Sequence, residues 1–304
     1  MPSAATSTQP TREIAAPPAA APGGPADVGE IWIEAAYRGA LATAGLDSVP
    51  LVMAGASGRC LRALRDRENW RLEIPGPSGE LRGAYLKKHH ERRLQYWLRA
   101  KLGLRLPNTP GRIEAENNNR LERAGIAAMR TIAFGERLHA NGLLESFVLT
   151  EELTGFTQLD HFIRQRFEEF NSTARGPTAQ HAAFEKLSRR VAAVAGQFHR
   201  AGFNHRDLYC CHFFIREDVA GDFEVRMIDL QRVQRRARWR RRWIVKDLAQ
   251  LHFSAPRERV SCSRRLAFFK QYLGVDRLRP QDKRLIRSVL RKCWLMEYKL
   301  GPHP

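Results

Sequence analysis

The stretch from Phe203 to Phe214 holds the residues whose types and spacing are best suited to chemistry. It reads Phe-Asn-His-Arg-Asp-Leu-Tyr-Cys-Cys-His-Phe-Phe and lies between an apolar segment of helical periodicity and a short apolar run. A carboxylate on such a loop can accept the proton of a hydroxyl group that attacks a phosphate. Asp207 is therefore the candidate catalytic base, with His205 and Arg206 beside it. The triplet His-Arg-Asp at residues 205–207 is by itself weak support for a catalytic role, because any basic chain contains some such triplets by chance.

A second carboxylate follows at the end of a predicted strand. Turn-prone residues 217–222 precede an apolar strand over 223–228, which ends at Asp229. A loop base, a tight hairpin and a strand ending in Asp is the order in which kinases place a base beside a metal-binding carboxylate. Asp229 is thus the predicted Mg²⁺ ligand. It is followed by Leu230-Gln231, so the mobile glycine of regulated protein kinases is missing.

A candidate for binding the phosphates of ATP lies upstream. The run Ala-Tyr-Leu-Lys that ends at Lys87 fits without a gap the strand template Val-Ala-Ile-Lys, whose Lys contacts the α- and β-phosphates. Lys87 is preferred over Lys88 on this ground. The polar segment 112–123 offers Glu114 or Glu116 as the helix carboxylate that would hold this lysine.

With these positions in place, the chain resembles the bacterial lipopolysaccharide kinase family, whose members phosphorylate inner-core sugars such as heptose or Kdo. The resemblance covers residues 80–255 and rests on blocks in the family's order. These blocks are Tyr85-Leu86-Lys87-Lys88-His89, Leu121-Glu122-Arg123-Ala124-Gly125-Ile126, Leu149-Thr150-Glu151-Glu152-Leu153, Asn204-His205-Arg206-Asp207-Leu208-Tyr209, Ile228-Asp229-Leu230-Gln231-Arg232 and Lys246-Asp247-Leu248-Ala249-Gln250-Leu251.

The resemblance implies roles for further residues. It favours Glu114 over Glu116 as the partner of Lys87. It implies that the backbone around Glu151 and Leu153 is the hinge that meets adenine, and that Asp247 anchors the catalytic loop from the large lobe. The cofactors implied are ATP and Mg²⁺.

The same resemblance implies an α+β fold, a bilobal protein-kinase-like fold with a small β-rich N-lobe and a larger helical C-lobe. We expect the N-lobe at residues 28–150 and the C-lobe at residues 151–304. A chain of 304 residues with 43% hydrophobic residues is large enough for both. Residues 1–27 are rich in Ala and Pro without periodicity, which predicts a disordered tail.

Hydrophobic periodicity predicts four elements within these lobes. Apolar residues at helical spacing predict helices over 31–46, over 178–202 and over most of 266–300. Residues 70–74 and 81–86 read as a hairpin around a Pro- and Gly-rich turn.

Two positions depart from the general kinase pattern. His212 occupies the place, five residues after the base, where protein kinases carry a metal-binding Asn. Imidazole is a poor ligand for Mg²⁺, so His212 is predicted to orient the loop or a phosphate oxygen; a core histidine is the alternative. The pair Gly55 and Gly58 ahead of Lys87 fits a phosphate-covering loop no better than a surface turn.

Part of the formal charge of +19 is concentrated in two places. Residues 232–243 follow the predicted metal ligand Asp229, in the part of the chain with which kinases bind their acceptor. The candidate acceptor-binding side chains there are Arg235, Arg236, Arg238 and Arg240. Residues 87–105 interleave basic and aromatic side chains, which suits an anionic membrane surface. For each stretch the alternative is a solvated cationic face.

Cysteine usage and hydropathy indicate the compartment. The five cysteines form no pair at zinc-ligand spacing, and Cys210 and Cys211 read as small apolar fillers. Prolines interrupt every alanine run at the N-terminus, unlike a signal peptide, and no stretch has the apolar length of a membrane-spanning helix. We expect a cytoplasmic protein, peripheral on the cytoplasmic face of the inner membrane.

Three functions follow. The leading one is an ATP-dependent kinase of a heptose or Kdo sugar in the lipopolysaccharide inner core, with a lipid-linked core oligosaccharide as acceptor and an acidic protein as a further candidate partner. The second is a kinase of the same fold acting on a protein or a soluble small molecule. The third is a nucleic-acid-binding protein or inactive pseudokinase, which is disfavoured because a binder has no use for Lys87, Asp207 and Asp229 in kinase order.

Overall fold

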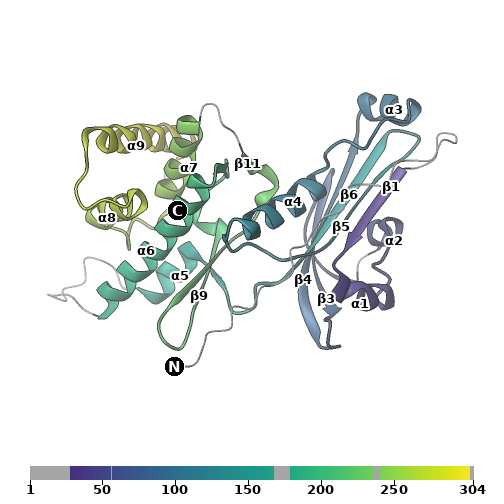
Figure 1. Cartoon of the computed structure of the whole chain (residues 1–304), viewed down its shortest axis with the longest axis horizontal. Helices are drawn as coiled ribbons and strands as arrows, with labels where there is room; N and C mark the ends of the chain where they lie inside the picture. The colour runs from purple at the N-terminus through teal and green to yellow at the C-terminus, as the bar shows by residue number, and fades with distance from the viewer. Residues whose placement is uncertain (1–27, 56, 168–178, 236–239, 302–304) are drawn as a thin grey trace, which may run out of the picture. The chain divides into compact units, whose positions relative to one another are not determined.

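The computed structural model describes residues 28–301 except for Ala56, residues 168–178 and residues 236–239 (Figure 1). Contacts within the chain divide it into two compact units. Unit 1 consists of the described residues up to Asn119 together with Thr131–Leu149. Unit 2 consists of Arg120–Arg130 and the described residues from Thr150 onward.

The units differ from the predicted lobes at residues 120–130 and at Thr150, which belong to unit 2. Residues 120–130 were expected in the N-lobe, but they pack with unit 2, because Leu121 and Ile126 are buried in its core. The predicted tail 1–27 lies outside the described residues, and so do Arg236 and Arg238.

Unit 1 is built on one sheet of six strands in the order β1-β5-β6-β4-β3-β2. Its strands are β1 Val28–Ile33, β2 Gly58–Leu64, β3 Arg67–Pro75, β4 Leu81–Arg92, β5 Thr131–Leu138 and β6 Leu143–Glu151. Its helical elements are η1 Ala35–Tyr37, α1 Arg38–Thr43, α2 Val49–Ala54, α3 Leu94–Lys101 and α4 Pro110–Arg123, the last of which crosses the boundary between the units.

The predicted hairpin of β3 and β4 is confirmed. The strands are antiparallel, with Pro75 paired to Leu81 beside the Pro- and Gly-rich turn. Side chains of β4 alternate, so that Ala84 and Leu86 are buried in the core while Lys87 points the other way and is partly exposed. The strand thereby fixes the direction of the candidate phosphate-binding lysine.

The predicted helix over residues 31–46 is wrong in its first part. Residues 28–33 form β1, which pairs antiparallel with β5, and Trp32 stacks on Phe134 with ring centroids 6.0 Å apart. Ile31, Trp32 and Ile33 favour a strand once a partner strand is present, and that partner lies about a hundred residues along the chain. Within residues 31–46, only residues 35–43 are helical.

Both faces of the sheet are covered. Tyr37 and Leu41 pack with Leu72 and Leu86 in a core beneath α1 and α2. On the other face, Ala115 of α4 packs against residues of β5 and β6. Gly111 allows this close approach, because a Cβ there would lie 2.5 Å from the carbonyl oxygen of Phe147. The sheet therefore holds α4, and with it Glu114, at a fixed distance from its strands.

Unit 2 is mainly helical with short strands. Its helical elements are α5 Leu159–Arg166, α6 Ala179–Arg200, η2 Cys210–His212, η3 Leu230–Arg232, α7 Arg240–Ser254, α8 Cys262–Leu273 and α9 Pro280–Leu300. Its strands are β7 Thr157–Gln158, β8 Phe203–Asn204, β9 Phe213–Glu217, β10 Phe223–Met227 and β11 Gln234–Arg235.

The predicted helices of this unit are confirmed. α6 buries Phe184, Leu187, Val191 and Phe198 on one face, at helical spacing, and the chain turns at Gly202 with a φ of 93°. α8 and α9 account for the helical region predicted over 266–300. No described helix has the length and apolar character needed to cross a membrane.

We expect Gly111→Ala to lower the free energy of unfolding by about 1–3 kcal/mol, because the added methyl group meets backbone atoms that cannot move aside. Gly39→Ala in α1 is the matched control. A Cβ at Gly39 meets nothing within 4 Å, so this change should be neutral or stabilising. Urea denaturation of the two variants measures the difference, and equal stabilities would contradict the close packing of α4.

Candidate active site

One face of α7 holds the loop that carries Asp207. Asp247 is completely buried, and its carboxylate accepts the backbone N–H groups of His205 at 2.8 Å and Arg206 at 2.7 Å. One turn and two turns further along α7, Gln250 and Ser254 accept further N–H groups of the loop, those of Leu208 and Cys210. Asp247 thus contacts the backbone of this loop directly; that it anchors a catalytic loop stays a prediction.

Two residues of this region have left-handed backbone conformations. Arg206 has a φ of 73° and Asp229 a φ of 58°, and they are the only non-glycine residues with positive φ in the described part of the chain. Such conformations are uncommon outside glycine and persist where the surrounding structure enforces them, often at functional sites. Arg206 directly precedes the candidate base Asp207, and Asp229 is itself the second candidate carboxylate.

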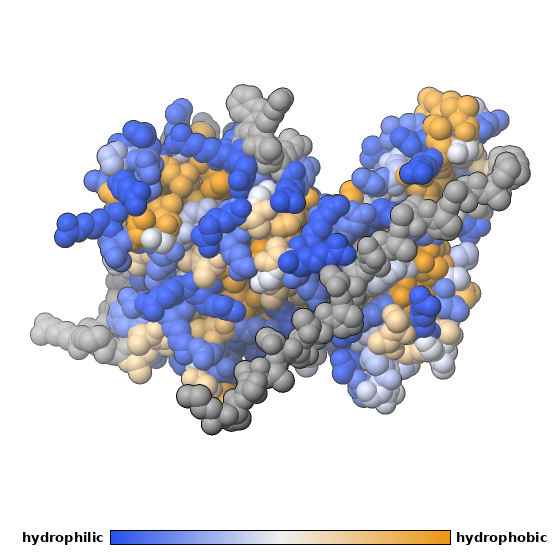
Figure 2. Space-filling view, in the orientation of Figure 1, coloured by the Kyte–Doolittle hydropathy of each residue, from blue (hydrophilic) through white to orange (hydrophobic). Residues whose placement is uncertain are grey.

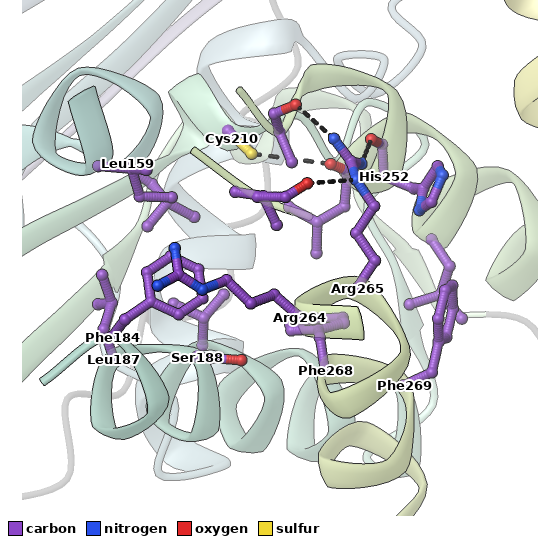
Figure 3. A pocket seen from close by; sticks show the side chains of 16 residues that line it. Leu159, Phe184, Leu187, Ser188, Cys210, His252, Arg264, Arg265, Phe268 and Phe269 are labelled. Atoms are coloured by element: carbon purple, nitrogen blue, oxygen red, sulfur yellow. Dashed lines mark hydrogen bonds between the residues drawn. The ribbon is translucent and has the colours of Figure 1, made fainter. Parts of the chain in front are cut away.

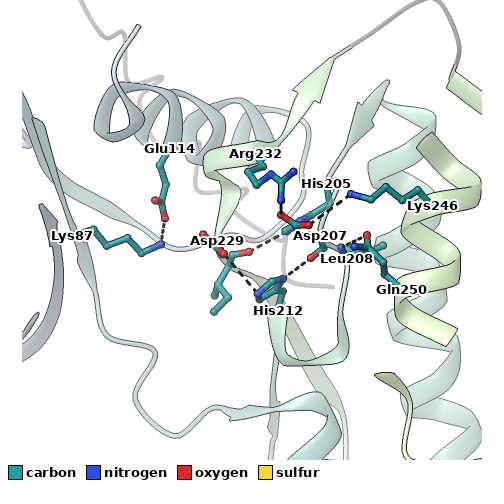
Figure 4. A network of polar contacts seen from close by, with 11 residues as sticks. Lys87, Glu114, His205, Asp207, Leu208, His212, Asp229, Arg232, Lys246 and Gln250 are labelled. Carbon is teal, nitrogen blue, oxygen red and sulfur yellow. Dashed lines mark hydrogen bonds and ion pairs between the residues drawn. The ribbon is translucent and has the colours of Figure 1, made fainter. Parts of the chain in front are cut away.

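His212 lies between the backbone carbonyl of Asp207 and the carboxylate of Asp229 (Figure 4). Its Nδ1 lies 2.5 Å from the carbonyl oxygen of Asp207, and its Nε2 lies 3.7 Å from Oδ2 of Asp229. The ring stacks on that of His205, with centroids 5.4 Å apart. The structure thus brings Asp207, His212 and Asp229 together in unit 2; the role of His212 stays a prediction.

Two cations that the sequence did not single out contact Asp207. Arg232 donates from Nη1 to Oδ2 at 2.5 Å, and the Nζ of Lys246 lies 3.7 Å from Oδ1. Lys246 also donates to the carbonyl of Arg206. A signal was present in the sequence, since Arg232 follows Asp229 by three residues and Lys246 precedes Asp247. Arg232 had been considered only as part of the basic segment 232–243, and Lys246 had no predicted role.

His205 is a neutral, buried histidine. Burial, followed by the nearby charge of His212, lowers its pKa to about 4. Its Nε2 lies 3.1 Å from the carbonyl oxygen of Ile228, while its buried Nδ1 has no hydrogen-bond partner. A proton on Nδ1 would therefore be buried without an acceptor, which explains the direction of the pKa shift.

Unit 1 contributes an ion pair of its own. Nζ of Lys87 on β4 donates to Oε1 of Glu114 on α4 at 2.7 Å, so the lysine and the carboxylate favoured from the sequence are in contact (Figure 4). Lys88 points into the opposite face, where its Nζ approaches the carbonyls of Met53 and Gly55 at 3.3 and 3.4 Å. Burial lowers the pKa of Lys88.

The remaining predicted residues lie in unit 2. Glu151 ends β6, and its N–H donates to the carbonyl of Arg130 at 3.0 Å, while the carbonyl of Leu153 accepts from Phe156 at 3.2 Å. Arg235 is exposed on β11, and Arg240 at the start of α7 donates to the carbonyl of His199.

An apolar pocket lies among α5, α6, α7 and α8 of unit 2 (Figure 3). Leu159, Leu187 and Phe268 line it, together with Arg264, whose guanidinium lies 4.2 Å from the ring centroid of Phe184. Nothing in the sequence pattern pointed to this pocket, because its lining residues read as ordinary core positions.

Comparison with known proteins decides the family. A model of the protein family described as Lipopolysaccharide kinase (Kdo/WaaP) family matches residues 57–272, which is more than half of the chain. The chain belongs to this family. The lipopolysaccharide core heptose(I) kinase WaaP of Pseudomonas aeruginosa is 33% identical over 237 residues, which cover 77% of this chain and 80% of that protein. The kinase of the same name from Escherichia coli K12 is 32% identical over 222 residues, covering 72% and 79%.

A solved structure described as WaaP in complex with acyl carrier protein is also similar to the chain. Its TM-score is 0.63 at 30% identity, and the match covers 89% of this chain and 97% of that one. The predicted resemblance to the lipopolysaccharide kinase family is confirmed. So is the predicted α+β, protein-kinase-like fold with one β-rich and one helical part.

The described side chains around Asp229 offer too few oxygen donors to hold a Mg²⁺ ion alone, but they suit one that is also bound by the phosphates of a nucleotide. Proteins usually hold Mg²⁺ through one or two carboxylates plus phosphate oxygens and waters. Within the described residues, no cluster of three or more His, Cys, Asp or Glu side chains could hold a metal ion. The carboxylate of Asp229 is partly exposed and is a suitable single oxygen donor.

The lowered pKa of His205 predicts a loss of stability in acid. In the unfolded chain this histidine titrates near its ordinary value of 6.5, whereas in the folded protein it titrates near 4. As the pH falls from about 6.5 to about 4, the unfolded chain therefore takes up a proton that the native protein does not, which removes about 3 kcal/mol of stability.

We expect the loss of unfolding free energy between pH 7 and acid to be smaller in His205→Gln than in the unchanged protein. His161→Gln is the control, because His161 is exposed on α5. Urea denaturation at a series of pH values measures both. If His205→Gln shows the same acid dependence as the unchanged protein, His205 is not the buried neutral group described above.

Proposed function

We propose that this protein is an ATP-dependent kinase that phosphorylates a sugar hydroxyl of the lipopolysaccharide inner core. The observation that carries the proposal is the cluster in which His212 contacts the loop of Asp207 on one side and Asp229 on the other. Membership of the lipopolysaccharide kinase family supports the acceptor class, and the names of the relatives favour heptose over Kdo. The family also favours this reading over a kinase of proteins or soluble small molecules and over a nucleic-acid binder.

In the proposed reaction, the acceptor hydroxyl oxygen forms a bond to the γ-phosphorus of ATP as the bond to the β-phosphate oxygen breaks. The hydroxyl proton moves to the carboxylate of Asp207, and ADP leaves. Arg232 and Lys246 fix this carboxylate by charge and hydrogen bonds. Arg206 and His205 act through the backbone contacts that hold the loop on Asp247.

Asp229 would hold Mg²⁺, which when bound with ATP neutralises charge on the phosphates. His212 orients Asp229 and the loop instead of serving as a metal ligand, since its two ring nitrogens face the carbonyl of Asp207 and the carboxylate of Asp229. The chain thereby does without the oxygen donor that protein kinases carry at this position.

The nucleotide would contact further residues. Lys87, held by Glu114, would bind the α- and β-phosphates. The backbone of Glu151 and Leu153 would meet adenine; the amide of Glu151 also donates to the carbonyl of Arg130.

The acceptor would dock on the Arg-rich segment. Arg235 is exposed and suits contact with phosphate or carboxylate groups, whereas Arg240 is partly engaged by the carbonyl of His199. Arg236 and Arg238, which lie outside the described residues, belong to the same predicted set.

We further propose that the protein works at the cytoplasmic face of the inner membrane, where a lipid-linked core oligosaccharide would be presented, and that an acyl carrier protein is its acidic partner. A similar structure is described as a complex with acyl carrier protein. The apolar pocket of unit 2 (Figure 3) has the lining that an acyl chain requires.

Asp207→Asn should lower kcat by about 10²–10⁴-fold, because the amide cannot accept the proton, while Mg²⁺-dependent ATP binding persists. Asp229→Asn should lose both turnover and Mg²⁺-dependent ATP binding. Asp222→Asn, in the β9–β10 hairpin turn, is the control and should keep full activity. Radiolabelled phosphate transfer to core oligosaccharide and nucleotide binding with and without Mg²⁺ measure these effects. More than a tenth of wild-type turnover in Asp207→Asn would contradict its role.

Lys87→Met should abolish phosphoryl transfer and leave a folded protein, because the change removes the charge that Glu114 holds but keeps the aliphatic stem. Lys88→Met should retain turnover, since Lys88 faces backbone carbonyls on the other side of the strand. Turnover is measured on protein whose folding is verified by circular dichroism. Loss of turnover in Lys88→Met with Lys87→Met active would reverse the assignment.

A further inference from the structure

The outer face of α3 in unit 1 is apolar, whereas surface helices usually turn polar residues outward. Of the 16 exposed large hydrophobic residues in the described part of the chain, five lie between residues 94 and 104. Figure 2 shows apolar surface gathered over α3. The five residues are Leu94, Trp97, Leu98, Leu102 and Leu104.

The inner face of α3 holds the helix firmly in unit 1. Tyr96 is buried in a small core with Leu138 and Leu144 of the adjacent strands. The backbone of Trp97 packs so closely on the β5–β6 turn that a Cβ at Gly142 would lie 2.8 Å from it. The apolar outer face is therefore presented by a fixed helix, and it cannot be buried by a simple rotation of α3.

Positive charge surrounds this apolar face. Residues 92–105 contain five basic and no acidic side chains. Nζ of Lys101 lies 4.9 Å from the ring centroid of Trp97, one of the five exposed residues. The remaining basic residues are Arg92, Arg93, Arg99 and Arg105.

We propose that α3 and residues 102–105, here called the α3 surface, dock the protein on an anionic lipid bilayer. Leucine and tryptophan would enter the boundary between headgroups and acyl chains, and the basic side chains would contact lipid phosphates around them. The inference deepens the proposed function and rests on it for its biological setting, since a kinase of a lipid-linked acceptor must reach the membrane surface.

The charge pattern favours a bilayer over other occupants. In a two-fold dimer the same patch would face itself and bring Lys101 and its basic neighbours against one another. A nucleic acid would satisfy the cations but would leave the leucines without an apolar partner. An anionic bilayer satisfies both, because long basic side chains can keep their charges at the headgroups while their stems and the leucines are buried.

The test is flotation of the full chain with vesicles of phosphatidylglycerol and phosphatidylcholine, and with vesicles of phosphatidylcholine alone. We expect binding to the anionic vesicles, and we expect Leu94→Ser/Leu98→Ser to weaken it about tenfold or more. These two side chains are 73% and 46% exposed, so the variant should fold.

Leu81→Ser/Leu61→Ser is the matched control, with side chains 70% and 47% exposed. Leu81 begins β4 and α3 follows its other end, so the strand separates them by roughly 40 Å. The control should bind vesicles as the unchanged protein does. Equal weakening by both double variants, or no weakening by either, overturns the assignment to the α3 surface.

A second measurement locates the contact. Brominated phospholipids should quench tryptophan fluorescence, and Trp97→Phe should remove most of that quenching. Quenching that persists in Trp97→Phe overturns the proposal, because a different tryptophan would then enter the bilayer. So does a homodimer that Leu94→Ser/Leu98→Ser dissociates in light scattering without lipid, because a second copy would then cover the face.

Vesicle binding is measured without ATP or acceptor, so it is independent of turnover. If the protein binds vesicles through the α3 surface but does not phosphorylate core oligosaccharide, the proposed function fails and the docking surface stands. If it phosphorylates a lipid-free acceptor but binds no anionic vesicle, the docking surface fails and the proposed function stands.

Discussion

The carboxylate of Asp247 holds the loop that carries Asp207, and the geometry of the candidate site in unit 2 depends on this contact. It is completely buried, and it accepts two consecutive backbone N–H groups, those of His205 and Arg206. A buried carboxylate without such donors would be strongly destabilising, so α7 and the loop stabilise one another. The contact holds Arg206 at positive φ, and the next residue, Asp207, is directed to Arg232 and Lys246.

His212 extends this constraint to the second carboxylate. An imidazole has nitrogens on opposite sides of one rigid ring, and here they face the loop carbonyl and Asp229. Stacking on the neutral ring of His205 further fixes its plane. An asparagine at this position would offer an oxygen to a metal but would not bridge the two groups in this way. With His212 engaged in this way, Asp229 stays the proposed metal ligand among the residues that lie together in this part of unit 2.

The basic side chains that give the chain its positive charge lie in several different structural environments. Arg232 and Lys246 are placed on the candidate base, and Arg265 donates to three backbone carbonyls beside the apolar pocket, those of His252, Ala255 and Val260. The cations around α3 instead flank exposed leucines. The net charge of +19 does not distinguish these environments, because composition carries no information about which side chains are buried or which groups they contact.

The sequence by itself determined the features that depend on neighbouring residues. The helical period of residues 178–202, the β3–β4 hairpin and the histidine at position 212 in place of the kinase asparagine could all be read locally. The order of Asp207 and Asp229 predicted a chemistry for them. The tertiary structure decided what depends on partners far along the chain. Residues 28–33 became a strand because β5 pairs with them, and Glu114 met Lys87 because Gly111 lets α4 approach the sheet. Arg232 and Lys246 reached Asp207 only through packing, and the apolar side of α3 faces outward because Tyr96 occupies the inner one. Hydrophobic periodicity shows that a helix has two faces, but only its contacts decide which of them is buried.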